Sequence, residues 1–235
     1  MELLKKYFNE LDIPYNNDQI EMFRNYYELL TEWNNRMNLT SITQSDEVII
    51  KHFVDSALIC CFMKFEDKSR LIDVGTGAGF PGLPIKILNP DCNVILLDSL
   101  NKRIRFLNEV IDTLGLKNIE AIHGRAEDVS RENTYRGKFD YAVSRAVANL
   151  STLSEYCIPF IKEGGKFISY KSDKSNEEIN NSATALQCLN SEITSIKEIT
   201  IPDTDIKRRL IVITNKKSVN KKYPRKAGIP AKEPL

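Results

Sequence analysis

The first regular pattern along the chain is a stripe of large apolar residues at helical spacing. The members of the stripe recur every three or four residues, so they share one face of a helix. Asp18 followed by Glu21 resembles a capping box that would begin this helix. Asn34, Asn35 and Asn38 favour a turn that would end it. The stripe consists of Ile20, Phe23, Tyr27, Leu30 and Trp33.

From residue 70 onward, short apolar runs alternate with amphipathic segments. This alternation predicts the α/β class: a Rossmann-like, doubly wound, mostly parallel sheet of seven strands with helices on both faces. The last two strands are close enough in sequence to form an antiparallel hairpin. Ligands of such sheets bind at the carboxyl ends of the strands. The predicted strands are 71–74, 94–98, 119–123, 139–144, 165–171, 193–201 and 209–214, and the predicted helices are 83–88, 102–114 and about 150–161.

Pattern and charge divide the chain into three parts. Residues 1–66 are predicted to form a helical extension with a second helix at about 47–63, residues 67–215 the α/β domain, and residues 216–235 a tail. The tail holds seven basic side chains and one acidic one, a net charge of +6, so residues 1–215 carry −5 within a whole-chain charge of +1. Such a tail is either an extended arm that neutralises phosphates or a disordered, solvated segment.

The composition excludes several classes of protein. With 42% hydrophobic and 28% charged residues, the chain has the balance of a soluble globular protein. Its longest apolar run, residues 57–63, is far shorter than the roughly 20 residues that cross a bilayer. The first residues lack the features of a secretory signal, so we expect no membrane association and a cytoplasmic location. None of the five cysteines forms a CxxC pair, so we expect neither disulfides nor a metal site.

A glycine-rich loop follows the first predicted strand and opens a helix. Gly75, Gly77 and Gly79 have the spacing GxGxG, and Phe80 stands where a GxGxxG motif would have its last glycine. A dinucleotide needs amide donors at this loop for its diphosphate. The proline after Phe80 has no N–H, and an aspartate precedes the loop, so phosphate is disfavoured there. The loop favours S-adenosylmethionine, which carries a sulfonium cation and no phosphate.

Acidic residues stand at or just beyond the ends of three predicted strands. Asp73 would lie near the methionyl end of S-adenosylmethionine, and Asp98 would accept hydrogen bonds from both ribose hydroxyls. Ala126 and Glu127 would meet adenine through a backbone amide and a carboxylate. Three acids around a cation-bearing ligand form a coherent electrostatic set. Taken singly, Asp98 could instead cap the helix that follows, and Glu127 could be a solvated loop residue.

These stretches resemble the small-subunit rRNA guanine-N(7) methyltransferases, the glucose-inhibited division protein B family. The resemblance covers nearly the whole chain, and the tail resembles the longer form of the family. The matching motifs are Asn38-Leu39-Thr40-Ser41, His52 with Asp55-Ser56, residues 73–82 with Pro84, residues 97–107 (LDSLNKRIRFL), Arg125-Ala126-Glu127, Ser144-Arg145-Ala146 and residues 222–235 (KYPRKAGIPAKEPL).

The resemblance implies a class I methyltransferase fold and the methylation of N7 of guanine 527 in 16S rRNA. It implies S-adenosylmethionine as cofactor, S-adenosylhomocysteine as product, and 16S rRNA or the small ribosomal subunit as partner. We expect the enzyme to be a monomer. By resemblance, cofactor contacts fall on Gly75, Phe80, Ala126, Glu127 and Arg145.

The implied reaction needs no general base, because N7 of guanine exposes a lone pair and carries no proton. Catalysis then consists of aligning the nucleophile, the methyl group and the sulfur while excluding water. The rate is therefore predicted to be nearly flat between about pH 6.5 and 9. Arg145, at the end of the fourth strand, is the candidate catalytic residue that orients guanine or the cofactor. The structural alternative is an ion pair with Glu127 or Asp98.

Two groups of basic residues are candidates for binding RNA. Three of them crowd the first turn of the helix at 102–114, where each cation is disfavoured by roughly 0.3 to 1 kcal/mol, so contact with phosphates would account for them; a solvated face is the alternative. The other three lie in the tail. The candidate RNA-binding residues are Lys102, Arg103, Arg105, Lys222, Arg225 and Lys226.

Other functions remain open from the residues alone. His52, Asp55 and Ser56 could share a helix face, but without a GxSxG elbow a polar network between the N-terminal helices and the α/β domain is favoured over a hydrolase. The remaining alternatives are a nicotinamide-dependent oxidoreductase, a small-molecule methyltransferase and a protein that binds the cofactor without turnover. A cytosine-C5 enzyme is disfavoured because Cys157 follows Tyr156 rather than a proline.

Overall fold

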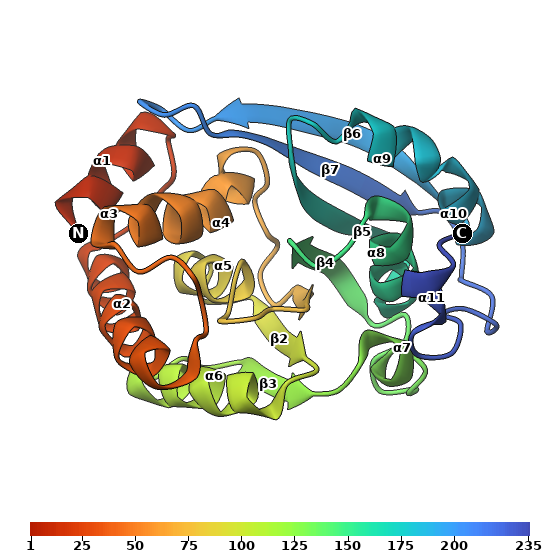
Figure 1. The fold of residues 1–235 in the computed structure, drawn as a ribbon, viewed down its shortest axis with the longest axis horizontal. Helices are drawn as coiled ribbons and strands as arrows, with labels where there is room; N and C mark the ends of the chain where they lie inside the picture. The colour runs from red at the N-terminus through yellow and green to blue at the C-terminus, as the bar shows by residue number, and fades with distance from the viewer.

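A computed structural model describes all residues, 1–235. Its centre is one seven-stranded sheet of order β3-β2-β1-β4-β5-β7-β6 (Figure 1). The first five strands pair in parallel, whereas β7 is antiparallel to both β5 and β6. This confirms the predicted fold and its hairpin. The strands are β1 (Arg70–Val74), β2 (Asn93–Asp98), β3 (Ile119–His123), β4 (Phe139–Arg145), β5 (Ile161–Ser172), β6 (Ser191–Thr200) and β7 (Lys207–Asn215).

Helices cover both faces of the sheet. None of them has both the length and the apolar character that crossing a membrane requires. The longer helices are α1 (Glu2–Glu10), α2 (Asn17–Met37), α5 (Gly82–Leu88), α6 (Asn101–Thr113) and α8 (Leu150–Cys157). The shorter ones are α3 (Ser45–Val48), α4 (Asp55–Ala57), α7 (Ala126–Val129), α9 (Asn176–Asn181), α10 (Ala183–Cys188), α11 (Ile229–Lys232), a π-helical segment Ile49–Val54 and 3₁₀ turns at Leu58–Cys61 and Ile158–Phe160.

Two hydrophobic cores lie on the two faces of the sheet. Side chains alternate along a strand, so Leu71 of β1 joins a core of 38 buried residues while Ile72 joins a second core of 19. The larger core is built with α1 to α6, which lie together on one side in Figure 1. The smaller core is built with α8, α10 and the tail. The N-terminal helices are therefore one layer of the α/β unit.

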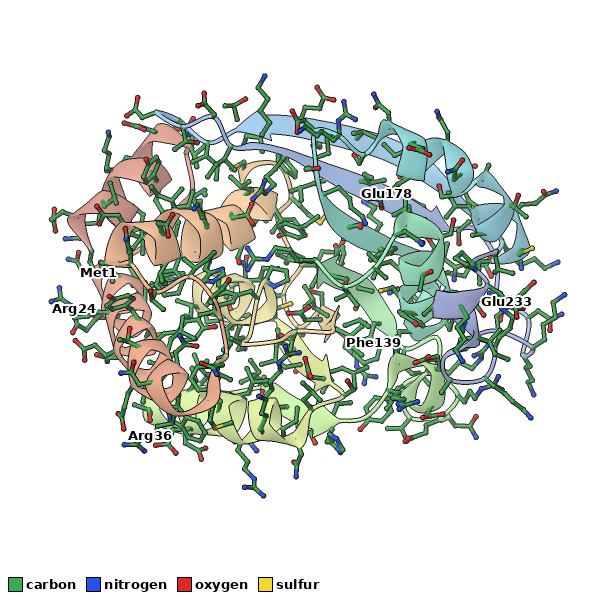
Figure 2. All side chains as sticks on the ribbon, viewed as in Figure 1. Met1, Arg24, Arg36, Phe139, Glu178 and Glu233 are labelled. Atoms are coloured by element: carbon green, nitrogen blue, oxygen red, sulfur yellow. The ribbon has the colours of Figure 1, made fainter.

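Helix α2, which carries the apolar stripe, differs from the sequence prediction in its cap and in part of its last turn. The capping box is formed by Asn16 and Gln19, not by Asp18 and Glu21: the Asn16 side chain accepts from the Gln19 N–H at 2.9 Å, and the Gln19 side chain accepts from the Asn16 N–H at 2.8 Å. At its other end, Asn34 and Asn35 lie within the helix, because Trp33 packs on Phe106 of α6 and tertiary contacts outweigh their turn preference. Asn38 ends the helix in the left-handed conformation, φ +46°, as its turn preference predicted. In Figure 2, Arg24 and Arg36 lie on its outer side.

The segment from Ser45 to Cys61 runs as helix, as predicted, but is not uniform. It passes from α3 through the π-helical turn Ile49–Val54 and α4 into a 3₁₀ turn. The π turn carries His52, and Asp55 follows it directly. Helices α1, α7, α9, α10 and α11 have no counterpart among the predicted elements.

The tail is neither extended nor disordered. It folds back against α7 and α8 and contains the short helix α11 (Figure 1). Tyr223 is buried, and its carbonyl oxygen accepts from Nη1 of Arg136 at 2.9 Å. Thr152 on α8 donates its hydroxyl to the carbonyl oxygen of Pro230 at 2.9 Å. The apolar and hydrogen-bonding residues among the tail's many charges account for this docking.

Candidate active site

A cavity of about 630 Å³ opens at the carboxyl ends of β1, β2 and β4. This is the place where open α/β sheets bind ligands, and the volume is that of a small-molecule site. Segments from the whole length of the chain line it: the loop after α2, the π-helical turn, the glycine loop, the ends of β2 and β4, the start of α7, and Gly228 of the tail.

The glycine loop uses its own amides internally. The N–H groups of Gly75 and Thr76 both donate to the carbonyl oxygen of Leu97, at 2.9 and 3.1 Å. The N–H of Gly77 donates to Oδ2 of Asp98 at 2.9 Å, and the N–H groups of Gly79 and Phe80 donate to the carbonyl oxygen of Thr76. These five amides therefore have partners within the protein and are not free to hold a diphosphate.

Gly75 and Gly79 of the loop each require a glycine, but for different structural reasons. Gly75 lines the cavity with φ +74°, and a Cβ there would lie 2.6 Å from Cγ2 of Val147. Gly79, with φ +98°, does not line the cavity; a Cβ there would lie 2.3 Å from Cδ1 of Leu83. Of the glycines assigned to the cofactor, Gly75 and Gly77 border the cavity, whereas Gly79 serves the packing of the loop on α5.

Asp73 lies outside the cavity, contrary to its predicted place at the methionyl end. Its side chain is fully buried, and Oδ2 accepts from the Thr76 hydroxyl and the Gly82 N–H, both at 2.7 Å. Burial raises the pKa of Asp73 to about 7. The carboxylate therefore holds the two ends of the glycine loop together instead of facing a ligand, because it points back under the loop.

Asp98 ends β2 and borders the cavity, as predicted. Its two oxygens accept from the N–H groups of Gly77 and Leu100, each at 2.9 Å, and from Nη1 of Arg103 at 3.1 Å. Arg103, one of the candidate RNA-binding residues, is thereby drawn to the cavity, which it lines. The carboxylate is 2% exposed and lies where a ligand hydroxyl could share it.

Ala126 and Glu127 line the cavity at the start of α7, which follows β3, the neighbour of β2 in the sheet. Glu127 is 6% exposed, and its Oε1 accepts from the N–H of Gly228 at 2.9 Å. The solvated-loop alternative for Glu127 is therefore wrong. Arg125 and Tyr156 complete this end of the cavity. The sequence motif identified the two predicted residues but gave no sign of Gly228.

Arg145 pairs with Asp55, and not with Glu127 or Asp98. Its Nη1 lies 2.6 Å from Oδ2 of Asp55 and donates to the carbonyl oxygen of Lys51 at 3.0 Å. The other oxygen of Asp55 accepts from Nε of Arg208 on β7 at 2.6 Å. Asp55 is 2% exposed. This confirms the predicted polar network between the N-terminal helices and the sheet, with two arginines as its anchors.

An aromatic stack forms the wall beside Arg145. The His52 ring lies on Phe80 with centroids 4.5 Å apart, and Phe80 lies on Tyr26 at 5.4 Å. Burial, and then the charge of Arg145, lower the pKa of His52 to about 4, so the ring is neutral at pH 7. Its Nδ1 accepts from Nη2 of Arg145 at 3.3 Å, which leaves the proton on Nε2, 2.9 Å from Oγ1 of Thr40.

The other predicted RNA-binding residues differ in their freedom. Lys102 and Arg105 on α6, and Lys222 and Lys226 in the tail, are exposed. Arg225 instead pairs with Glu155 on α8, at 2.7 Å between Nη2 and Oε2. Four of the six residues thus present their charges to solvent.

A second depression of about 490 Å³ adjoins the cavity and shares Arg145 with it. Lys51, Lys171 and Arg208 also line it, so cations dominate its wall. These residues come from the π-helical turn, β5 and β7. Sequence reasoning missed them because no motif links them; only the order of the strands brings them together.

Comparison with known proteins gives a consistent result. Residues 19–210 match the family model described as GidB, rRNA small subunit methyltransferase G. The chain is 52% identical over 225 residues to the ribosomal RNA small subunit methyltransferase G of Lachnoclostridium phytofermentans, covering 96% of this chain and 93% of that protein. It is 48% identical to the protein of the same name from Clostridium botulinum strain Loch Maree, covering 99% of this chain and 98% of that protein.

Solved structures share the fold at low sequence identity. M. jannaschii TYW2 in complex with AdoMet is 14% identical, with a TM-score of 0.56 over 74% of this chain and 77% of that one. A chain from the complex between the Haloferax volcanii Trm112 methyltransferase activator and a methyltransferase is 13% identical, with a TM-score of 0.60 over 80% of this chain and 98% of that one. These likenesses establish the class of fold.

Proposed function

The chain belongs to the rRNA small subunit methyltransferase G family, and from this we propose that it transfers the methyl group of S-adenosylmethionine to N7 of guanine 527 in 16S rRNA. The observation that supports this most directly is the glycine loop, in which the amides of Gly75, Thr76, Gly77, Gly79 and Phe80 have partners within the protein. A loop of this kind suits a cationic donor without phosphates and disfavours a dinucleotide. The alternative of a nicotinamide-dependent oxidoreductase is therefore disfavoured, because these five amides are not free to bind the diphosphate of its cofactor.

The residues around the cavity fit S-adenosylmethionine. Asp98, at the end of β2, would accept hydrogen bonds from the ribose hydroxyls. Its ion pair with Arg103 would either persist beside the ribose or break when the cofactor binds. Ala126 and Glu127 would bind adenine, and Gly75 allows close approach of the backbone. When bound, this cofactor supplies an electrophilic methyl group on a sulfonium.

The protein's part in the reaction is placement. Arg145 would orient the acceptor edge of guanine at the mouth of the cavity, held in position by Asp55. Phe80 and His52 would exclude water from that side through their stacked rings. His52 does not serve as a base, because both of its ring nitrogens are engaged by Arg145 and Thr40. Unprotonated N7 needs no base.

The function is tested by methyl transfer to small-subunit RNA from a strain that lacks the gene. The purified protein is incubated with this RNA and methyl-labelled cofactor, and the modified base is mapped. We expect one methyl group on N7 of one guanine. Label on another base, on a small molecule only, or binding without transfer would reject the proposal. Naked RNA, assembly intermediates and assembled subunits are compared as substrates.

The buried Asp73, with its pKa of about 7, narrows the flat range expected from the sequence, about pH 6.5 to 9. We predict that the single-turnover rate changes little from about pH 8 to 9, because no side chain has to lose a proton for the attack. Between pH 6.5 and 8, Asp73 titrates near its pKa of about 7, so an inflection there would report the glycine loop. Asp73→Asn should remove that inflection and leave the flat region. A rate that rises tenfold per pH unit above pH 8 would contradict a reaction without a base.

We predict that Lys102, Arg103 and Arg105 contact phosphates of the RNA. Replacing all three by alanine should weaken RNA binding and reduce the slope of log K against log salt by about 0.7 to 0.9 for each phosphate that is no longer neutralised. Lys197 and Lys207 are exposed on the hairpin of β6 and β7, called the distal hairpin below. Replacing both by alanine provides the control variant. An unchanged slope in the triple variant would dismiss these residues as an RNA contact.

We also propose that the protein works as a monomer in the cytoplasm, where its rRNA substrate is made. Only three large apolar side chains are conspicuously exposed, Leu100, Val147 and Ile196, and Val147 belongs to the lining of the cavity. Lys222 and Lys226 of the tail are proposed to add RNA contacts.

A further inference from the structure

The tail provides one wall of the cofactor cavity. Gly228 borders the cavity, and no other residue beyond Tyr156 does so. Its N–H donates to Oε1 of Glu127, the carboxylate assigned to the adenine end. Gly228 has φ +84°, so a glycine at this position turns the backbone toward Glu127 without strain. The contact joins residues 101 positions apart.

An ion pair with a buried carboxylate holds Arg225, three residues before Gly228, against α8. Glu155 is 1% exposed in its side chain, and its carboxylate receives Nε and Nη2 of Arg225 at 3.0 and 2.7 Å and also the Arg225 backbone N–H. A buried carboxylate needs such partners, because leaving it unpaired is costly. Arg225 is therefore the structural partner that α8 requires, rather than a charge kept free for RNA.

Further contacts hold the tail on both sides of that pair. Arg136 donates to the carbonyl oxygens of Val219, Asn220 and Tyr223 at 2.9 to 3.2 Å. On the other side, the carbonyl oxygen of Pro230 accepts from Thr152. The main-chain position of Gly228 is thus set by α7, α8 and the loop between α7 and β4, and the basic side chains that remain free point to solvent.

We propose that residues 225–230 are part of the cofactor-binding site, in which they hold Glu127 in place at the adenine end. This rests on the proposed function in so far as adenine binds there. Because the docked tail and the bound cofactor share Glu127, each stabilises the other. Removing the tail must then weaken cofactor binding, and binding must protect the tail, by the reciprocity of linked equilibria.

The test compares two variants with the full chain by calorimetry with S-adenosylmethionine, without RNA. A chain that ends at Ala227 lacks Gly228 and the Pro230 hydrogen bond but keeps Arg225. The matched control, Lys222→Ala with Lys226→Ala and Lys232→Ala, removes three charges but keeps the wall. We expect about tenfold weaker binding for the shortened chain, because one hydrogen bond to a charged group is absent and the wall is less ordered, and less than about twofold change for the control.

A second ligand locates the effect. Methylthioadenosine contains the adenosine part without the amino acid, so its affinity for the shortened chain should fall by the same factor as that of S-adenosylmethionine. Equal affinities of the full and shortened chains for both ligands, with both proteins folded by circular dichroism, would overturn the proposal. Failure of the full chain to bind S-adenosylmethionine at all would instead reject the proposed function.

Hydrogen exchange covers the case in which the shortened chain does not fold. In the full chain, the amides of residues 225–229 should exchange at least about fivefold more slowly with saturating S-adenosylmethionine, whereas those of the distal hairpin between β6 and β7 should not change. The same exchange rate with and without cofactor, when the glycine loop is protected, would show that the tail is only a structural segment and would overturn the proposal.

Discussion

At the scale of single residues, the carboxylate of Asp55 forms ion pairs with two arginines at once. It is buried, and it holds Arg145 and Arg208 at 2.6 Å from each. Removing its charge leaves two partly buried guanidiniums without their counterion. We predict that Asp55→Asn lowers the free energy of unfolding by about 3 kcal/mol, measured by urea denaturation at pH 7.5.

An exposed ion pair provides the control for that substitution. Glu198 is 66% exposed in its side chain and pairs with Arg209 on the neighbouring strand. Glu198→Gln should change the free energy of unfolding by less than about 1 kcal/mol, because water already solvates the carboxylate. If both substitutions cost the same small amount, the anchoring role of Asp55 is not supported.

At the scale of elements, helix α2 is capped by Asn16 and not by the predicted Asp18. The Asn16 side chain accepts from the Gln19 N–H, whereas Asp18 lies within the first turn. We predict that Asn16→Ala lowers the free energy of unfolding by about 1 kcal/mol. Asp18→Ala should cost no more than about 0.5 kcal/mol, from its interaction with the helix dipole. The reverse order in thermal or urea melts would restore the predicted cap.

At the scale of the whole molecule, one core links the N-terminal helices to the sheet. The core of 38 residues contains Phe23 of α2, Phe53 of the π-helical turn and Leu96 of β2. The proposed division at residue 66 therefore marks a change of pattern along the chain and not a gap between cores. We predict a single calorimetric transition with equal van't Hoff and calorimetric enthalpies. Two resolved transitions would show that residues 1–66 unfold separately.

Much of the fold could be predicted because its determinants are local. Apolar runs predicted the seven strands to within a few residues for most of them, and the glycine loop followed from its composition and place after β1. Strand β5 is longer than predicted, because it begins at Ile161 rather than at the glycines that follow. Gly75, Phe80 and Glu127 were correctly placed at the cavity, since strand ends of a parallel sheet converge.

The errors concern partners rather than positions. Asp73 was expected at a ligand and is buried under the loop, because the direction of its side chain depends on the register of β1 beneath α5. Arg145 was correctly placed at the mouth, but its partner Asp55 is 90 residues away. Arg225 was assigned to RNA and pairs with Glu155, 70 residues away.

The amino-acid sequence by itself determined the class of fold and the place of the cavity at the glycine loop, because side-chain periodicity and turn residues over a few positions decide these features. Only the tertiary structure decided which charges are free. A buried carboxylate finds a partner only where the path of the chain brings one within about 3 Å. That path places the Gly228 N–H beside Glu127 as a hydrogen-bond donor, and two arginines beside Asp55 as ion-pair partners.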